Sequence, residues 1–499
     1  MLYEQVSKQV MPPGKAVKLS DAQITTLRDW INAGALTEQA EKPIELVSHL
    51  FATTRGVDKP IVAREQESYH LVAAEVSAAT AQEISDHAER YPGAQLVRYR
   101  LRCYPRGDSA AQLIGYISVD ESAIEVSTFE ESTSNSTPFE FTRRAAAGIE
   151  SVADELLKPS IGVMRRVIAR NGQELSSRVE SLPEAGGDIH LSIDPKLQAW
   201  TERVLDRCSQ MALPPGSVFK PVVAIALLEA GRLNAEARFT CQGYLDDEDA
   251  WRCAIFRRQG IGHGDIDLAE ALAVSCNVFF FHHATELGAP AILDWAGKFG
   301  FGSSTGSDLP GEASGNLPED DAATDPRSKD KLARGIAIGQ HEITATPLQV
   351  VRMMAALANG GRLVTPTLMH SMEPVRNGAT QGTLIPMRRS SIAAVQAGLR
   401  MAVSDREGTA HDAAWLPTMA IAGKTGTAQS GGDRPDHAWF AGYVPAENPK
   451  FAFCAALEHG GDSTAATSIA RQVGQKMIEL NLIEAGDERS APQLDKHSR

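Results

Sequence analysis

The sequence predicts a multidomain α/β (α+β) protein whose larger part is an antiparallel sheet with helices on both faces. The chain has 499 residues, enough for about two to four domains. Long apolar helical stretches dominate its middle, and three extended runs then precede a closing helix, an order typical of a sheet packed between helices. The helical stretches cover 218–230, 268–287 and 348–358, the extended runs 418–422, 437–444 and 451–458, and the last helix about 464–480.

Changes in composition divide the chain into four segments. Residues 1–44 form a small helical segment, weakly similar to the C-terminal end of some c-type cytochrome domains but without the Cys-x-x-Cys-His motif that attaches haem. Residues 45–190 have a mixed α/β pattern. Residues 191–483 carry the long helices and the extended runs, and we expect the polar tail 484–499 to be disordered.

Charge and hydropathy exclude several classes of protein. The formal net charge is −14, and no basic block is present, so nucleic acid is not an expected partner. No run approaches the roughly 18 apolar residues that span a bilayer. The first residues also lack the charged and then apolar layout of a signal peptide. The sequence alone therefore gives no sign of an export segment.

The first motif with chemical meaning pairs a serine with a lysine. Ser217 lies where a turn that begins at Gly216 enters a predicted helix, and Lys220 follows one helical turn later on the same face. A serine hydroxyl needs a base to become a nucleophile. A lysine serves as that base when burial or a second cation destabilises its ammonium form. This spacing arises by chance about once in a chain of this length, so it needs support from other motifs.

The second motif, Ser275-Cys276-Asn277, lies within a predicted helical region. The hydroxyl of Ser275 could relay protons between the nucleophile and a leaving amine. The amide of Asn277 could hold a substrate carbonyl. Alone, this short pattern is also uninformative.

The third motif, Lys424-Thr425-Gly426-Thr427, ends an extended run. Gly426 would let a substrate strand lie against this edge as an added β-strand. Lys424 and Thr427 offer hydrogen-bond donors for a carboxylate. The three motifs therefore supply a nucleophile, a base, a proton relay and a carboxylate site.

In this order, the three motifs resemble those of the penicillin-binding proteins and serine β-lactamases. The resemblance covers roughly residues 50–480. Runs around the motifs are similar to the class B, elongation-type penicillin-binding proteins, and upstream runs are similar to the non-catalytic dimerisation or pedestal domain of that family. The first set is Gly262-His263-Gly264, 299–312, Ile338-Gly339-Gln340, 346–349 and 437–443, and the second is Tyr91-Pro92-Gly93, Gly115-Tyr116 and Gly148-Ile149-Glu150.

The resemblance implies a peptidoglycan D,D-transpeptidase that cross-links stem peptides through an acyl-enzyme and binds β-lactams as substrate mimics. It implies that Ser217 attacks the penultimate D-Ala carbonyl and that Lys220 takes the proton of the hydroxyl. Ser275 would pass a proton to the departing D-Ala. The positive charge of Lys424 is expected to help keep Lys220 neutral.

The resemblance also implies how substrate is held. Asn277 would position the peptide, and the motif of Lys424, Thr425, Gly426 and Thr427 would bind the terminal carboxylate. The backbone N–H groups of Ser217 and Thr427 would form an oxyanion hole. The implied partners are peptidoglycan stem peptides, β-lactams and a glycan-polymerising membrane protein. The implied location is the cell membrane, with the catalytic domain outside the cytoplasm.

The chain departs from the family pattern in two places. The family places a two-stranded hairpin before the nucleophile, but here residues 207–217 alone connect Asp206 to Ser217. His341 stands where the family has glycine. Two alternatives stay open. One is a serine β-lactamase or D,D-carboxypeptidase. The other, which the missing hairpin favours, is a catalytically impaired scaffold or β-lactam sensor.

Four zinc-compatible side chains lie before and within the second motif. They are Cys241, Cys253, His263 and Cys276. The short Cys-x2-4-Cys spacing of many zinc sites is absent. Some elongation-type relatives carry a metal near these positions, so the resemblance raises the case for a structural zinc. A Cys241–Cys253 disulfide and free thiols stay open as alternatives. The reaction itself is expected to require no cofactor.

Overall fold

The computed structural model describes residues 77–91, 96, 103–119, 143–160, 162–169, 174–204, 211–319, 325–369 and 382–484. The expected N-terminal segment 1–44 and residues 485–499 of the expected tail lie outside the described residues. The chain divides into two compact units. The smaller comprises Met1–Leu101, Asp120–Thr142 and Arg166–Ser177, and the larger comprises Arg102–Val119, Arg143–Arg165 and Arg178–Arg499.

In the smaller unit, the described helix α4 (Ala78–Asp86) is followed by the 3-10 turn η2 (Ala88–Arg90). The hydroxyl of Ser77 accepts a hydrogen bond from the backbone N–H of Thr80, which is the usual way for a serine to begin a helix. Strands β3 (Val163–Ile168) and β4 (Glu174–Ser181) form a two-stranded sheet of their own, and each strand has residues in both units.

The first part of the larger unit is built from short elements. They are α5 (Ala111–Ile114), β1 (Ile117–Val119), β2 (Arg143–Ala145), α6 (Gly148–Val152), α7 (Asp154–Leu157) and α8 (Pro195–Val204), with β1 antiparallel to β2. Gly115 and Gly148 have φ angles of 82° and 60°. A Cβ atom on Gly148 would lie 2.6 Å from the backbone nitrogen of Gly115. These two glycines allow the chain to approach itself closely between α5 and α6.

The main sheet of the described residues has three antiparallel strands, β9 (Ala422–Ala428), β10 (His437–Val444) and β11 (Phe451–Leu457), in the order β11-β10-β9. Side chains of β10 alternate between two hydrophobic clusters, as the period of a strand requires. Trp439 and Tyr443 belong to the larger cluster, and Phe440 belongs to the smaller one. Every residue of β10 is buried, so helices cover both faces of the sheet.

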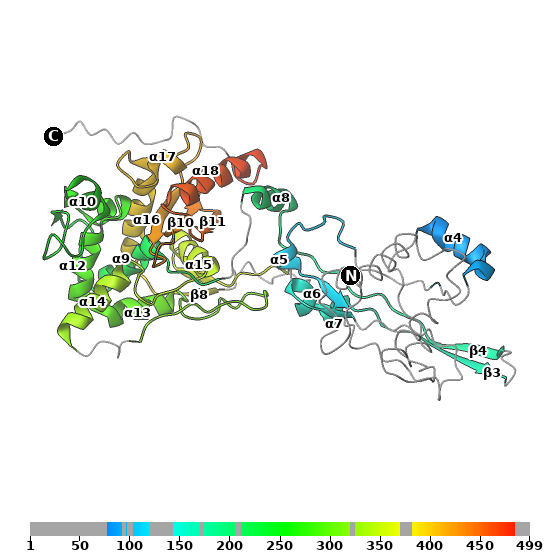
Figure 1. Cartoon of the computed structure of the whole chain (residues 1–499). Helices are drawn as coiled ribbons and strands as arrows, with labels where there is room; N and C mark the ends of the chain where they lie inside the picture. The colour runs from blue at the N-terminus through cyan, green and yellow to red at the C-terminus, as the bar shows by residue number, and fades with distance from the viewer. Residues whose placement is uncertain are drawn as a thin grey trace, which may run out of the picture. The chain divides into compact units, whose positions relative to one another are not determined.

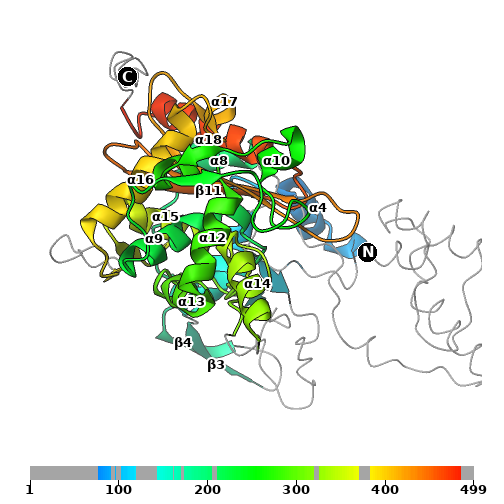
Figure 2. The same ribbon diagram turned by 90° about the vertical axis from the view of Figure 1, so that its left-hand side faces the viewer.

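Helices α15 (Pro347–Ala358) and α18 (Thr464–Glu479) cover these two faces. Figure 1 shows β10 and β11 between them, and Figures 1 and 2 show further helices grouped on the α15 side. The remaining elements of this region are η4 (Gly216–Phe219), α9 (Lys220–Glu229), β5 (Phe239–Cys241), α10 (Ala254–Gln259), β6 (Gly264–Ile266), α11 (Leu268–Ala273), α12 (Asn277–Leu287), α13 (Ala289–Lys298), α14 (Pro326–Ala337), β7 (Arg362–Val364), β8 (Gly382–Leu384), α16 (Arg389–Ser404) and α17 (His411–Ala414).

This arrangement confirms the predicted antiparallel sheet with helices on both faces. Two local predictions were wrong. The helical region expected over 268–287 is broken after Ala273, because Ser275 takes a left-handed φ of 55°. The extended run expected over 418–422 was misplaced, since β9 begins only at Ala422 and ends at Ala428, with the third motif in its second half.

The three strands bear on the expected lack of a hairpin before the nucleophile. Among the described residues, β11 pairs with β10 alone, so it forms one edge of the main sheet. Strand β9, which carries Lys424, forms the other edge. The segment 205–210 lies outside the described residues.

Candidate active site

Ser217 lies in a tight, almost fully buried turn. In η4, Gly216, Val218 and Phe219 are buried, and Ser217 is the partly exposed member. Gly216 has a φ of 58°, a left-handed value that favours glycine. Its N–H donates to the carbonyl of Gly339 at 3.0 Å. The turn thus presents the serine at the surface of a rigid support.

Two further glycines allow other segments to lie against this turn. A Cβ atom on Gly339 would come within 2.2 Å of the carbonyl oxygen of Gly216. A Cβ atom on Gly426 would meet Val218 Cγ1 at 2.9 Å and the carbonyl of Pro215 at 3.0 Å. We expected Gly426 to make room for a substrate strand. In the structure it makes room for the turn that carries Ser217.

Lys220 is completely buried at the start of α9 and joins the first motif to the second. Its Nζ donates to the carbonyl of Ser275 at 2.7 Å, to Ser275 Oγ at 3.1 Å and to Asn277 Oδ1 at 2.7 Å. Burial lowers the pKa of Lys220 to about 8, although the charges of Cys276 and Cys253 oppose the shift. A lysine with such a pKa is partly neutral near physiological pH, as a general base requires.

The hydroxyl of Ser275 reaches Lys220 because of the way α11 ends. The N–H of Cys276 donates to the carbonyl of Ala271 at 2.9 Å, and the N–H of Ser275 donates to that of Leu272 at 3.3 Å. This pair of bonds is a Schellman motif, in which the residue with left-handed φ is usually glycine. Here Ser275 occupies that position, and a non-glycine residue held there stores backbone strain.

Asn277 is the first residue of α12. Besides accepting from Lys220, its amide donates to the carbonyl of Arg252 at 3.5 Å. We expected Asn277 to position the substrate peptide. In the structure described here it also holds the amine of the base.

Lys424 is fully buried within β9. Its Nζ donates to the carbonyl of Thr425 at 3.0 Å and lies 3.4 Å from Thr425 Oγ1. Burial, together with the positive charge of Lys220, holds the pKa of Lys424 well below its ordinary value. We expected the charge of Lys424 to help keep Lys220 neutral. Burial is the largest cause of the lowered pKa of both lysines.

Thr427 is the exposed residue of an otherwise buried strand. Its carbonyl lies against Gly216, because a Cβ atom on Gly216 would be only 2.7 Å away from that oxygen. The end of the third motif is therefore next to the turn of the first. Within the described residues, the fold brings all three motifs together.

The four zinc-compatible side chains also converge. Cys253 Sγ lies 3.7 Å from Cys241 Sγ and 3.5 Å from Cys276 Sγ, and Cys241 Sγ lies 3.5 Å from His263 Nδ1. The three thiols are buried and unbonded to one another. Hydrogen bonding with Cys253, and then with Cys276, lowers the pKa of Cys241.

These distances fit a tetrahedral metal site. With zinc–sulfur bonds of about 2.3 Å, two thiolates on one zinc ion are about 3.8 Å apart. The four ligand atoms lie within 4.8 Å of one another. Cys276 lies between Ser275 and Asn277 in the sequence, so a metal bound to its thiolate would help to fix the position of the second motif.

A second histidine group has a different character. His282, His283 and Glu286 also lie close together near the end of α12. The ring of His283 packs against those of Phe279 and Phe239, with centroids 4.6 and 5.6 Å apart. These aromatic contacts indicate that His283 has a packing role.

Thr409 belongs to none of the three motifs. Its hydroxyl lies 2.8 Å from Thr425 Oγ1, and its N–H donates to the carbonyl of Ala273 at 3.1 Å. Thr409 lies between α16 and α17, far from either partner in sequence. No motif, periodicity or spacing available in a single sequence identifies such a bridge.

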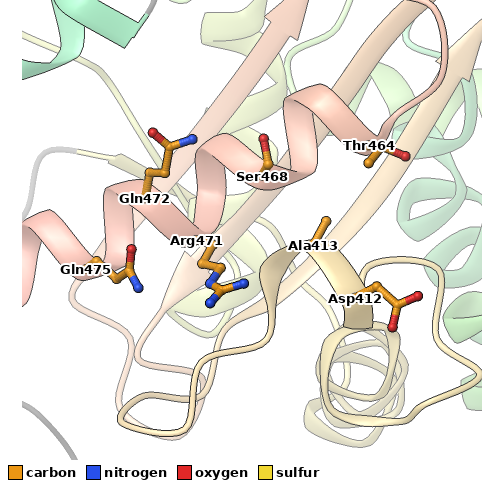
Figure 3. Close-up of a pocket in the computed structure, with 7 residues that line it drawn as sticks. All are labelled: Asp412, Ala413, Thr464, Ser468, Arg471, Gln472 and Gln475. Atoms are coloured by element: carbon orange, nitrogen blue, oxygen red, sulfur yellow. The ribbon is translucent and has the colours of Figure 1, made fainter.

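A pocket of about 470 Å³ lies between α17 and α18 (Figure 3). It contains none of the residues that the motifs predict to be catalytic or substrate-binding, so it is separate from the site. Its lining residues are Asp412, Ala413, Thr464, Ser468, Arg471, Gln472 and Gln475.

The arrangement around Ser217 defines a class of protein. A partly exposed serine lies one turn before a buried lysine of lowered pKa, and that lysine donates a hydrogen bond to a second hydroxyl, that of Ser275. These are the parts of a serine acyl-transferase that uses lysine as its base.

Comparison with known proteins identifies the family. The model of the penicillin-binding protein transpeptidase domain matches residues 184–479, and that of the penicillin-binding protein dimerisation domain matches residues 13–191. The chain belongs to the penicillin-binding protein family and is of the class B, elongation type.

Two curated relatives show the extent of the similarity. The chain is 26% identical over 469 residues to the peptidoglycan D,D-transpeptidase MrdA of Escherichia coli K12, covering 77% of this chain and 72% of the relative. It is 29% identical over 431 residues to the peptidoglycan D,D-transpeptidase PbpA of Mycolicibacterium smegmatis, covering 78% and 85%.

Solved structures share the fold. One is the complex between the penicillin-binding protein PBP2 and MreC from Helicobacter pylori, with a TM-score of 0.69 at 22% identity, covering 83% of this chain and 85% of that chain. Another is a peptidoglycan synthase complex that coordinates polymerization and crosslinking, with a TM-score of 0.62 at 22% identity and 80% of each chain covered. None of the described helices has the length and apolar character needed to cross a bilayer.

Proposed function

We propose that this protein is a peptidoglycan D,D-transpeptidase that works through an acyl-enzyme on Ser217. Its curated relatives carry that activity in their names. The single observation that carries the proposal is the set of bonds from buried Lys220, one helical turn after Ser217, to Ser275 and Asn277. These bonds support Lys220 as the base and Ser275 as the proton relay for the partly exposed hydroxyl of Ser217.

The first half-reaction forms an ester. Ser217 Oγ attacks the carbonyl carbon of the penultimate D-Ala of a stem peptide, and the neutral amine of Lys220 takes the hydroxyl proton. The C–N bond to the terminal D-Ala breaks, and a proton passes through the Ser275 hydroxyl to the departing nitrogen. The contact between Lys220 Nζ and Ser275 Oγ at 3.1 Å supports this relay.

The second half-reaction forms the cross-link. The amine of a second stem peptide attacks the ester carbonyl and loses a proton to the base. The bond to Ser217 Oγ breaks, and the serine recovers its proton. The N–H groups of Ser217 and Thr427 would stabilise the oxyanion in both halves, and each such donor typically contributes about 3 kcal/mol.

Substrate recognition falls to the third motif. Lys424 and Thr427 would bind the terminal carboxylate, because a lysine and an exposed threonine on one strand offer N–H and O–H donors. Asn277 would position the peptide while holding Lys220. The closeness of Thr427 to Gly216 supports a substrate bound across both motifs.

We also propose that Cys241, Cys253, His263 and Cys276 hold a structural zinc ion. The donor set and its distances support this better than a disulfide, since the Cys241 and Cys253 sulfurs are 3.7 Å apart and a disulfide needs about 2.05 Å. The ion would fix the segment from β5 to α12, and thereby Ser275, without entering the reaction. Zinc bound by thiolates contributes directly to folding.

Metal analysis of the purified protein tests the zinc proposal. We expect about one zinc per chain, with loss of the metal in Cys253→Ser, because Cys253 lies between the other two thiols. Cys454→Ser, which changes a free cysteine outside the cluster, should keep it. A metal-free wild-type protein would reject the site.

Fluorescent penicillin tests the proposed activity. We expect stable covalent labelling of the wild type and none in Ser217→Ala. Ser468→Ala, which removes a hydroxyl from the separate pocket on α18, should label normally. Labelling followed by rapid release would favour the β-lactamase alternative. Absence of labelling would favour the scaffold alternative.

For partners and location, we propose a glycan-polymerising membrane protein and an extracytoplasmic site of action. One structural neighbour belongs to a complex that coordinates polymerization and crosslinking, and another is bound to MreC. Cross-linking acts on glycan as it is polymerised, which supports a partner of this kind. Co-purification from detergent-solubilised membranes would test it, and recovery of the chain without any polymerase would count against it.

A further inference from the structure

The loop between α16 and α17 joins the second and third motifs through one side chain. Thr409 uses both its N–H and its hydroxyl to donate to the carbonyl of Ala273, at 3.1 and 3.2 Å. The same hydroxyl oxygen lies 2.8 Å from Thr425 Oγ1. Ala273 ends the helix before Ser275, and Thr425 follows Lys424. Thr409 therefore connects the residues that precede the proton relay with the carboxylate-binding strand.

The bond to Ala273 has a clear physical reason. The last four carbonyls of a helix lack partners inside the helix. In α11, those of Ala271 and Leu272 are taken by the Schellman bonds described above. The carbonyl of Ala273 receives its donors from Thr409 instead. This part of the cap is supplied from outside the helix.

The number of protons available determines which hydroxyl donates in the contact between Thr409 and Thr425. A threonine hydroxyl has one proton to donate, and a carbonyl can only accept. Because Thr409 donates its proton to Ala273, the contact with Thr425 requires Thr425 to be the donor. The proton of Thr425 then points toward Thr409, and its lone pairs are left for Lys424 Nζ, 3.4 Å away. A chain of donors thus runs from Lys424 through Thr425 and Thr409 to Ala273.

Such a chain favours one state of the lysine. Hydrogen bonds in series polarise one another. This chain ends on the carbonyl of Ala273, which accepts a hydrogen bond but has no proton to donate. Thr425 therefore faces Lys424 as an acceptor, which orients Lys424 Nζ and favours its ammonium form against the effect of burial. An ammonium is the form of lysine that attracts a carboxylate.

The loop itself is held firmly. Gly408 leaves no room for a side chain, since a Cβ atom there would be 2.4 Å from the carbonyl of Ala402. The N–H of Ala410 donates to that same carbonyl at 3.0 Å. Thr409 is exposed, although its hydroxyl points to buried partners. Replacing the hydroxyl with a methyl group should therefore leave the fold intact.

We propose that Thr409 is a positioning residue for carboxylate recognition, acting on Lys424 through the Thr425 hydroxyl. This inference rests on the proposed function of Lys424 as the carboxylate-binding group. It adds a residue that touches neither the substrate carboxylate nor the reacting atoms. Thr409→Val removes only the hydroxyl and keeps the shape, and Thr409→Ser keeps the hydroxyl and removes a methyl group.

The test measures reversible binding in a Ser217→Ala background, with benzylpenicillin and with its methyl ester, which lacks the free carboxylate. We expect Thr409→Val to weaken binding of benzylpenicillin about five- to tenfold, as loss of one hydrogen bond to a charged network does. Binding of the ester should stay within about twofold. Thr409→Ser should behave like its parent with both ligands.

In a second measurement, the wild-type background separates initial binding from acylation. Thr409→Val should raise the apparent dissociation constant for benzylpenicillin and leave the limiting acylation rate close to that of the parent. Equal weakening of acid and ester, or no weakening of either, would overturn the inference. Penicillin labelling that depends on Ser217 is scored separately, so the proposed function can stand while the role of Thr409 fails.

Discussion

At the scale of single residues, the chemistry depends on how Lys220 is held. Its three hydrogen bonds connect the base to both polar members of the second motif. The sequence identified these residue types and their order, because the motifs are local. It did not identify Asn277 as a support for the base, or Thr409 at all, because those contacts join segments that are distant in sequence.

The pKa of Lys220 leads to a pH prediction. Burial lowers it to about 8, and the neutral amine is the form that accepts the proton of Ser217. The rate of acylation by penicillin should therefore rise with pH and reach half of its limit near pH 8. Lys424, Cys276 and Cys253 are the charged or titratable groups whose fields couple to this site.

Stopped-flow or gel-based acylation measures that curve between about pH 6 and about pH 9.5, a range that brackets the lowered pKa of Lys220. Thermal unfolding at each pH controls for loss of folded protein. A rate that is flat across this range, or that falls as pH rises, would contradict a lysine base with a lowered pKa.

At the scale of elements, the site depends on chain segments that touch without room for a Cβ atom. Gly216, Gly339 and Gly426 bring η4, the segment after α14 and β9 into contact. The break between α11 and α12 places Ser275 in a left-handed position where glycine would be usual. Apolar periodicity could not predict this break, because both helices have continuous apolar faces. His341, expected to be unusual, has a φ of 65° that explains why glycine would suit it.

Gly339→Ala tests the contact under the nucleophile. The new Cβ atom would lie 2.2 Å from the carbonyl of Gly216, so the turn that carries Ser217 must shift. We expect the second-order labelling rate to fall by at least about tenfold, which is the effect of misplacing a reacting group by a fraction of an ångström.

Gly231→Ala is the matched control for that substitution. Gly231 has the same φ of 65°, but a Cβ atom there would meet nothing within 4 Å. The Gly231→Ala variant should lose about 1 kcal/mol of stability from backbone strain and be labelled by penicillin at the wild-type rate. Equal labelling by both variants would show that the contact between Gly339 and Gly216 does not matter.

At the scale of the whole molecule, the short connection before Ser217 is the feature that raised doubt about activity, and the main sheet of the described residues has three strands. The site depends on β9, whose register with β10 runs from Ala422 opposite Tyr443 to Ala428 opposite His437. Strand β11 lies on the far side of β10. Additional strands at that edge would therefore be separated from β9, which carries Lys424, by both β10 and β11. This geometry supports an active site that does not require them.

Two phenylalanine variants test that separation. The ring of Phe453 on β11 stacks on that of Phe440, with centroids 5.9 Å apart. The ring of Phe301 packs edge-on against that of Phe219, in the turn that carries Ser217, with centroids 5.4 Å apart. Each change to alanine should cost about 2–4 kcal/mol of stability, since a packed ring is lost. Labelling per folded molecule should be unchanged in Phe453→Ala and reduced in Phe301→Ala.

Chemical denaturation measures the stability of both variants, and labelling below the unfolding transition measures their activity. A large loss of labelling in folded Phe453→Ala would mean that the site depends on the β11 edge. In that case the three-stranded sheet would limit catalysis.

The sequence predicted the layered fold, the order of the last strands and helix, and the residue types of the site. These features follow from local periodicity and short motifs. The cysteine cluster was anticipated by residue type, but its convergence depends on how β5, β6 and the start of α12 fold together. The close glycine contacts and the Thr409 bridge are set by tertiary packing, which no spacing along one sequence encodes.

The most direct test of this account is to locate the acyl group. After reaction with benzylpenicillin, intact-mass measurement should show one adduct per chain. Peptide mapping should then place the adduct on Ser217, and it should be absent in Ser217→Ala. An adduct on another residue, or no adduct on a folded wild-type protein, would contradict the assignment of Ser217 as the nucleophile.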